Sequence, residues 1–197
     1  MYLTFYGGFN KDKMRIDINQ KKISIGDKYQ IFIDGQPTYK ASNELFRLLS
    51  VINLFKNDDT RARLTINKQW FFWKPKYNIR LHDNSTVEFR ADSWWEMHYQ
   101  CHCSPDIYHI YGHRGRKYSV YKNSTQVAWW EKEAVTWFEG DNYAITADND
   151  CNVELIIAFC LIIDNHKSKR HGDNVVSYNI GNIGGQVKEF DSYWRPK

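Results

Sequence analysis

The sequence has little of what would cross-link a chain or anchor it in a membrane. Its 197 residues include only four cysteines, too few for a disulfide scaffold in a chain long enough to bury a hydrophobic core. The longest apolar run, residues 155–163, is less than half of the roughly 20 residues that a membrane-spanning helix needs. The first residues, MYLTFYGG, show neither the basic nor the apolar region of a secretory signal. These absences favour a cytoplasmic protein without a transmembrane segment.

Sequence motifs of common enzyme classes are also missing. The chain has no G-x-S-x-G, no H-E-x-x-H and no glycine-rich phosphate loop between a strand and a helix. Glu131 and Glu133 would share one face of a strand, as paired acids do in some glycosidases, but among 23 acidic residues such a pair is expected by chance. We therefore predict no catalytic residues and no cofactor, and favour a non-enzymatic protein. The paired acids leave one alternative open, a carbohydrate-binding or glycan-active protein.

The segment MHYQCHC, residues 97–103, concentrates cysteine and histidine without the spacing of a metal site. Residues of a strand alternate between its two faces, so Cys101 and Cys103 would share one face and His102 would lie on the other. Zinc sites use C-x2–4-C pairs, whereas this segment has C-x-C. No metal ligand is predicted.

Aromatic residues, by contrast, are abundant. Trp 8, Tyr 13 and Phe 11 together make 16% of the chain. Such residues suit pleated, half-buried surfaces and favour β structure. The apolar content of 42% and the charged content of 25% are typical of a folded globular protein rather than a disordered one. A net charge of +4 is too small for a dedicated nucleic-acid binder, so no nucleic-acid partner is predicted.

From Met14 onward, short segments of alternating apolar and polar residues follow one another, separated by turn signals such as Asp34-Gly35 and Asn123-Ser124. This spacing predicts an antiparallel sandwich or barrel. Glu44–Phe55 differs, because its apolar residues recur at helical spacing and predict a short amphipathic helix. The expected strands are 14–18, 22–26, 29–33, 38–40, 61–67, 69–73, 77–82, 86–90, 94–103, 108–112, 117–122, 126–132 and 143–147.

Val153–Ile163 (VELIIAFCLII) is the most apolar stretch, and its period alone fits either a buried strand or a buried helix. Its β-branched residues favour a strand. Its length favours a helix, as do the Asp and Asn residues before it, which can cap the first amide groups. Lys167, Lys169 and Arg170 after the stretch suit the helix dipole. A helix that is apolar on every side must be enclosed on every side, and the inside of a closed barrel provides this.

This order of elements resembles the tubby C-terminal-like superfamily, in the branch that holds phospholipid scramblases, LURP-one-related proteins and small bacterial relatives. The resemblance implies an all-β fold, a closed antiparallel barrel of about twelve strands threaded by a hydrophobic helix. We expect a single domain over residues 1–197, with a core at about 21–165 and a C-terminal extension, 166–197, on the outside. The resemblance rests on the hairpin 29–35, the paired strands 62–73 and 77–90, the stretch 108–132, and the apolar run that follows 141–145.

The resemblance carries no catalytic set over to this chain. Some tubby-like domains bind phosphoinositides through basic residues on the barrel surface. Scramblase activity needs acylation sites and membrane association that this sequence does not show. The resemblance therefore implies a non-enzymatic binding or scaffold protein, at most peripheral to a membrane, whose partner is an anionic phospholipid or another protein.

Residues 61–80 carry six basic side chains and no acidic one, with the aromatic run WFFW between them. A basic, aromatic hairpin of this kind can contact anionic lipid head groups. The alternative is that the cations lie on solvated strand faces or pair with the acidic segment 131–164. The candidate lipid-binding residues are Arg61, Arg63, Lys68, Lys74, Lys76 and Arg80.

Adjacent aromatic pairs, such as Trp94-Trp95 and Trp129-Trp130, place one ring inside a barrel and one outside. Exposed aromatic rings usually mark contact, here with a sugar, with a membrane or with another protein subunit. The alternative is that the N-terminal segment or an outer helix covers these rings. Exposed rings give a second candidate function, a protein-interaction or oligomerisation module. The candidate contact residues are Trp70, Trp73, Trp95 and Trp130.

Overall fold

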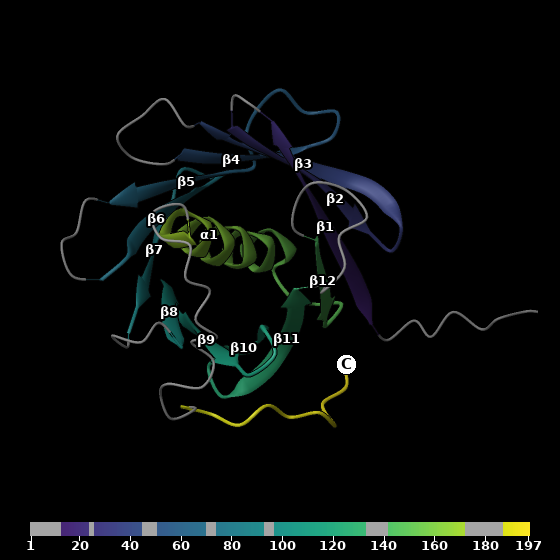
Figure 1. Cartoon of the computed structure of the whole chain (residues 1–197), viewed down its shortest axis with the longest axis vertical. Helices are drawn as coiled ribbons and strands as arrows, with labels where there is room; N and C mark the ends of the chain where they lie inside the picture. Colours follow the sequence, from purple (N-terminus) through teal and green to yellow (C-terminus); the bar gives the residue numbers. More distant parts are fainter. Residues whose placement is uncertain are drawn as a thin grey trace, which may run out of the picture.

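The structure, a computed structural model, describes residues 13–23, 26–44, 51–69, 74–92, 97–132, 142–171 and 187–197. Within these residues, twelve strands close into an antiparallel barrel around a single helix (Figure 1). This architecture confirms the fold class that the sequence predicts. The elements are β1 (Met14–Ile23), β2 (Gly26–Ile33), β3 (Gln36–Glu44), β4 (Val51–Lys56), β5 (Leu64–Gln69), β6 (Lys76–Leu81), β7 (Thr86–Ala91), β8 (His98–Cys103), β9 (Asp106–His113), β10 (Lys117–Lys122), β11 (Thr125–Lys132), β12 (Asn142–Ala147) and α1 (Val153–His171).

Each strand pairs with its neighbours in the sequence, and the first strand pairs with the last. β1 and β12 run antiparallel from Met14 opposite Ala147 to Asn19 opposite Asn142. This pairing closes the described strands into a ring, so each has a hydrogen-bonded neighbour on both sides. Closure removes the sheet edges that would otherwise be open to other chains.

The turns predicted from the sequence have the backbone conformation that tight hairpins need. Asp34 and Gly35 have φ values of 50° and 79°, the left-handed pair typical of a two-residue hairpin turn. Asn123, at the other predicted turn, has a φ of 55°. Asn and Asp tolerate this region because their short side chains can hydrogen-bond to the nearby backbone.

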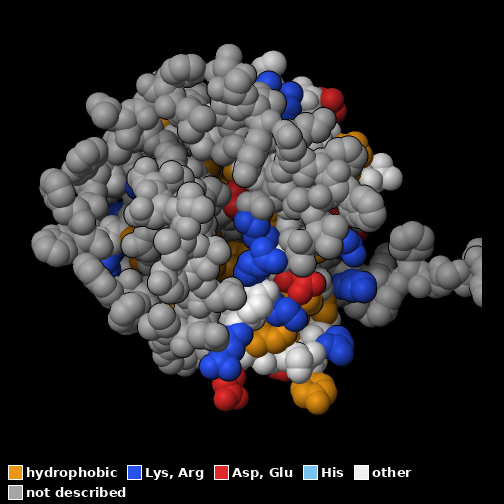
Figure 2. Space-filling model, in the orientation of Figure 1, with side chains coloured by type: hydrophobic (Ala, Val, Ile, Leu, Met, Phe, Trp, Pro, Cys, Tyr) orange, Lys and Arg blue, Asp and Glu red, His pale blue; other side chains and the backbone are white. Residues whose placement is uncertain are grey.

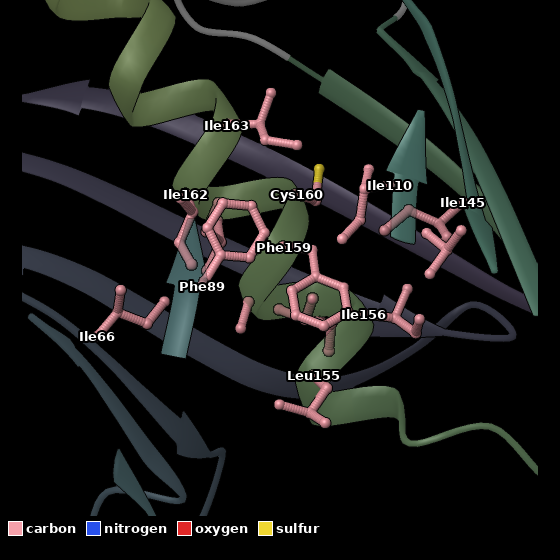
Figure 3. Packing of buried hydrophobic residues seen from close by; sticks show 14 of the residues in the cluster. Ile66, Phe89, Ile110, Ile145, Leu155, Ile156, Phe159, Cys160, Ile162 and Ile163 are labelled. Atoms are coloured by element: carbon pink, nitrogen blue, oxygen red, sulfur yellow. The ribbon is translucent and has the colours of Figure 1, made fainter. Parts of the chain in front are cut away.

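The helix α1 fills the barrel. Asn152 caps it, because its Oδ1 accepts a hydrogen bond from the backbone N–H of Leu155 at 3.1 Å. From residue 155 to residue 163, every side chain is at most 3% exposed. Barrel side chains lie on opposite sides of the helix, with Ile66 on one side and Ile110 on the other (Figure 3). The most apolar stretch is therefore a helix enclosed on all sides, as predicted.

Two helix predictions are wrong. The amphipathic helix expected at Glu44–Phe55 does not form, because β3 extends to Glu44 and residues 51–56 form β4 between β3 and β5. Residues 45–50 lie outside the described part. Ile52 and Leu54 point into the barrel, 1% and 0% exposed, so the two-residue period of a strand prevails over the helical spacing. The central helix also continues to His171, which places the basic residues expected after it within its last turns.

Candidate functional site

The basic residues of the 61–80 hairpin do not form one surface. β5 and β6 pair antiparallel, with Thr65 opposite Arg80 and Lys68 opposite Tyr77. Side chains alternate along a strand, and Tyr77 is 1% exposed inside the barrel. Lys68 therefore shares the inward face of β5, whereas Arg80 and Lys76 lie on the outward face of β6.

Three of the six candidate cations bind to one of the acidic residues Glu154, Glu88 and Asp92. The guanidinium of Arg63 donates from Nε to Oε1 of Glu154, in the first turn of α1, at 2.8 Å. This ion pair raises the pKa of Arg63 and ties β5 to the start of the helix. Lys76 pairs with Glu88 at 2.6 Å, and Lys74 Nζ donates to the backbone oxygen of Asp92 at 2.7 Å. The Arg63 contact is of the kind expected from the alternative in which the cations pair with the acidic segment 131–164, whereas Lys74 and Lys76 contact residues outside that segment.

Of the other three candidates, Arg61 and Arg80 line a surface hollow of about 100 Å³ together with His82, whereas Lys68 does not. Arg61 Nη2 donates to the backbone oxygen of His82 at 3.3 Å, which orients the guanidinium beside the hollow. Its other polar lining comes from Thr65 and Asn84, and no acidic side chain lines it. Among the described residues, no ion pair joins either arginine to a carboxylate. The hollow is therefore suited to an anion.

A larger hollow, of about 360 Å³, lies along the outer side of β6 and β7. Lys74, Lys76 and Arg90 line it, but so do the carboxylates of Glu88 and Asp92. Because these two carboxylates offset two of the three cations, this hollow attracts an anion less strongly than the smaller one does. The smaller hollow is the better candidate site.

The structure describes one of the four aromatic candidates, Trp130. Trp70, Trp73 and Trp95 lie outside the described residues. Trp130 was expected at a contact surface, but it is 1% exposed and stacks on Tyr118 inside the barrel, with ring centroids 5.1 Å apart. That expectation is wrong, because the inward-facing ring of the pair is Trp130. The outward-facing ring is Trp129.

Strand β8 has the alternation that the sequence predicts. Cys101 is fully buried inside the barrel, and burial raises the pKa of its thiol to about 12. His98 lies on the other face, where Nδ1 contacts Asp92 Oδ2 at 3.0 Å and Nε2 contacts His109 Nδ1 at 3.1 Å. Burial is the main cause that lowers the pKa of His98 and of His109. With both nitrogens of His98 engaged, the ring is fixed in place and stacks on Tyr111 at 4.6 Å.

The outer face of β9 to β11 is covered by the chain itself. Residues 187–197, the C-terminal segment, run along the outside of the barrel (Figure 1, yellow). Phe190 packs between His113 and Trp129, with ring centroids 5.2 Å and 5.5 Å away. Burial lowers the pKa of His113 to about 4. Sequence analysis placed this segment outside the barrel but did not find its contact surface.

Comparison with known proteins identifies one family. The model of a family described as LURP-one-related matches residues 14–164 of this chain. The matched range begins at the first residue of β1 and ends within α1, so it takes in all twelve strands and the enclosed part of the helix. No curated protein and no solved structure matches the chain. Among the described residues, no helix has the length and hydropathy to span a bilayer.

Proposed function

The chain belongs to the LURP-one-related family of the tubby-like superfamily, and from this premise we propose that it is a non-enzymatic binding protein that contacts anionic phosphate head groups at a membrane surface. The observation that carries the proposal is the hollow between Arg61 and Arg80, which has two guanidinium groups and no acidic lining residue.

The barrel itself restricts where a ligand can bind. The side chains of α1 occupy the barrel interior, where residues 155–163 are at most 3% exposed. A ligand must therefore bind on the outer surface or at a barrel end. The hollow lies on the outer surface beside the turn from β6 to β7, at the end where Arg63 contacts the first turn of α1.

The chemistry of the hollow suits a phosphate group. Arginine presents a planar fork of N–H donors that matches phosphate oxygens, and the hydroxyl of Thr65 and the amide of Asn84 add polar groups to the lining. Each basic residue near an anionic membrane surface adds about 1 kcal/mol of attraction. Two such residues give weak, salt-sensitive binding, as expected of a peripheral protein.

Reversing both charges, Arg61→Glu with Arg80→Glu, is expected to weaken binding to anionic vesicles by at least about tenfold, because attraction of about 1 kcal/mol per residue becomes repulsion. Vesicle flotation at low salt measures this, with neutral phosphatidylcholine compared with the same lipid containing a phosphoinositide. The matched control is Arg114→Glu with Arg116→Glu, which makes the same change in net charge at exposed residues of the turn between β9 and β10. Equal flotation with both lipids, or an equal loss in the control, contradicts the proposal.

A second candidate function is a protein-interaction module. One observation favours it, namely that an outer face of the barrel already holds a segment of polypeptide against Trp129. The carbohydrate alternative gains no such support, because Glu131 pairs with Lys117 at 3.6 Å and Glu133 lies outside the described residues.

A further inference from the structure

The outer face of β9, β10 and β11 holds the C-terminal segment in the way that a receptor holds a peptide. We propose that this face is a peptide-docking surface that recognises a lysine two positions before an aromatic residue. Its resident ligand is the C-terminal segment, and its partner is a segment of another protein with the same pattern, which displaces the resident one. This inference is independent of the anionic hollow, which lies on β5 and β6.

The first element of the surface is an aromatic corner that holds an ammonium group. The rings of Tyr111 and Tyr121 stand nearly at right angles, 80° apart, with centroids separated by 5.6 Å. Lys188 Nζ lies over both, 3.9 Å from the centroid of Tyr121 and 5.5 Å from that of Tyr111. His98 stacks flat on Tyr111 and fixes that ring. Cations over aromatic faces at these distances are attracted by the ring quadrupole.

The second element is an aromatic slot for Phe190. His113 and Trp129 meet its ring edge-on, at interplanar angles of 65° and 70°. Lys117 Nζ lies 5.3 Å from the centroid of Phe190 and 5.8 Å from that of Trp129. The corner holds Lys188, and the slot holds Phe190, two residues further along the segment. This spacing defines the pattern that the surface recognises.

Two further contacts lead the segment toward the start of α1. Trp194 Nε1 donates to the backbone oxygen of Gln126 at 3.2 Å. The backbone N–H of Lys197 donates to Asp148 Oδ1 at 2.7 Å. The lower edge of the molecule, where the segment runs in Figure 1, presents hydrophobic side chains beside Lys and Arg side chains (Figure 2).

The C-terminal segment is held weakly enough for another peptide to replace it. Most of its residues are exposed, including Val187 at 55% and Tyr193 at 86%. No backbone-to-backbone hydrogen bond joins described residues of the segment to those of the barrel. Each described contact of the segment with the barrel therefore involves a side chain of one partner, and segments with few buried contacts open at low free-energy cost. An extended segment anchored by a few side chains is also the usual form of a peptide ligand.

A fluorescently labelled peptide of residues 187–197, added to the full-length protein, tests the proposal by fluorescence polarisation. In the wild-type chain the resident segment competes at an effective concentration of about millimolar. Phe190→Ala in the protein weakens this competitor, so the labelled wild-type peptide is expected to bind this variant on the order of tenfold more tightly than the wild type. Trp129→Ala added to the Phe190→Ala protein removes a wall of the slot and is expected to abolish that gain.

Two controls make the result specific. A peptide with Lys188→Ala and Phe190→Ala is expected to lose the binding, and Arg114→Glu in the protein is expected to leave it unchanged. Equal peptide affinity for the wild-type and Phe190→Ala proteins, or equal binding of the doubly substituted peptide, overturns the proposal. If a variant does not fold, hydrogen exchange of the wild-type protein replaces it as the test. Excess unlabelled peptide is expected to displace the protein's own residues 187–197 and so to speed their exchange. Unchanged exchange overturns the proposal.

Discussion

Replacing Phe159 with alanine is expected to lower the free energy of unfolding by about 3–5 kcal/mol. Phe159 is fully buried at the middle of the enclosed stretch 155–163 and packs against two rings of the barrel wall, one of which, Phe89, is labelled in Figure 3. Its ring centroid lies 5.6 Å from that of Phe89, on β7, and 5.6 Å from that of Tyr108, on β9. Truncation leaves a cavity that the closed wall cannot collapse to fill.

Urea denaturation followed by circular dichroism measures this loss. The matched control is Phe55→Ala, the same truncation on β4 at a half-buried position next to the inward-facing Leu54. We expect the control to cost no more than about 1.5 kcal/mol, because the site is partly exposed before the change. Equal losses for the two variants would show that the helix is not the centre of the core.

Asp164→Ala is expected to lower the free energy of unfolding by about 2–4 kcal/mol. Asp164 is 4% exposed, and both of its carboxylate oxygens accept hydrogen bonds from tyrosine hydroxyls. Tyr143 OH donates to Oδ1, and Tyr29 OH donates to Oδ2 at 3.1 Å. Gln20 Nε2 in turn donates to Tyr29 OH at 3.4 Å. The substitution removes an acceptor of two tyrosine hydroxyl groups inside the barrel.

A double-mutant cycle separates this hydrogen-bond network from simple packing. Once Asp164 is alanine, Tyr143→Phe is expected to cost less than it does in the wild-type chain, because its hydroxyl has already lost that acceptor. Additive losses within about 0.5 kcal/mol would show that Asp164 and Tyr143 are not coupled. Asp164→Asn, which keeps an acceptor oxygen of the same size, is expected to cost less than Asp164→Ala.

The sequence predicts the architecture well because the barrel depends on local patterns. Alternating residues define most strands, polar turns separate them, and one run apolar on all sides requires an enclosed helix. The prediction fails at Glu44–Phe55 because Ile52 and other apolar residues there fit both the helical and the strand period. Only the neighbouring strands β3 and β5 decide between the two, and their positions are a tertiary property.

The surface is less predictable, because its contacts join residues that are far apart in the sequence. The ion pair between Arg63 and Glu154 spans 91 residues, so a hairpin that is uniformly basic in sequence is partly neutralised in the fold. Likewise, no local pattern shows that Lys188 lies over Tyr121. The Trp129-Trp130 pair shows the same limit, because adjacency predicts that one ring points inward but not which one.

Cysteine scanning of the helix tests the enclosed helix most directly. Single substitutions Leu155→Cys, Ile156→Cys, Ile157→Cys and Ala158→Cys place thiols about 100° apart, and so cover all sides of the helix. They are made in a chain with Cys103→Ser and Cys151→Ser, because these two native thiols are only partly buried. If the barrel encloses the helix, all four thiols react with maleimide only as fast as the whole protein unfolds. Rapid reaction at any of the four positions under native conditions would show an open side and contradict the account.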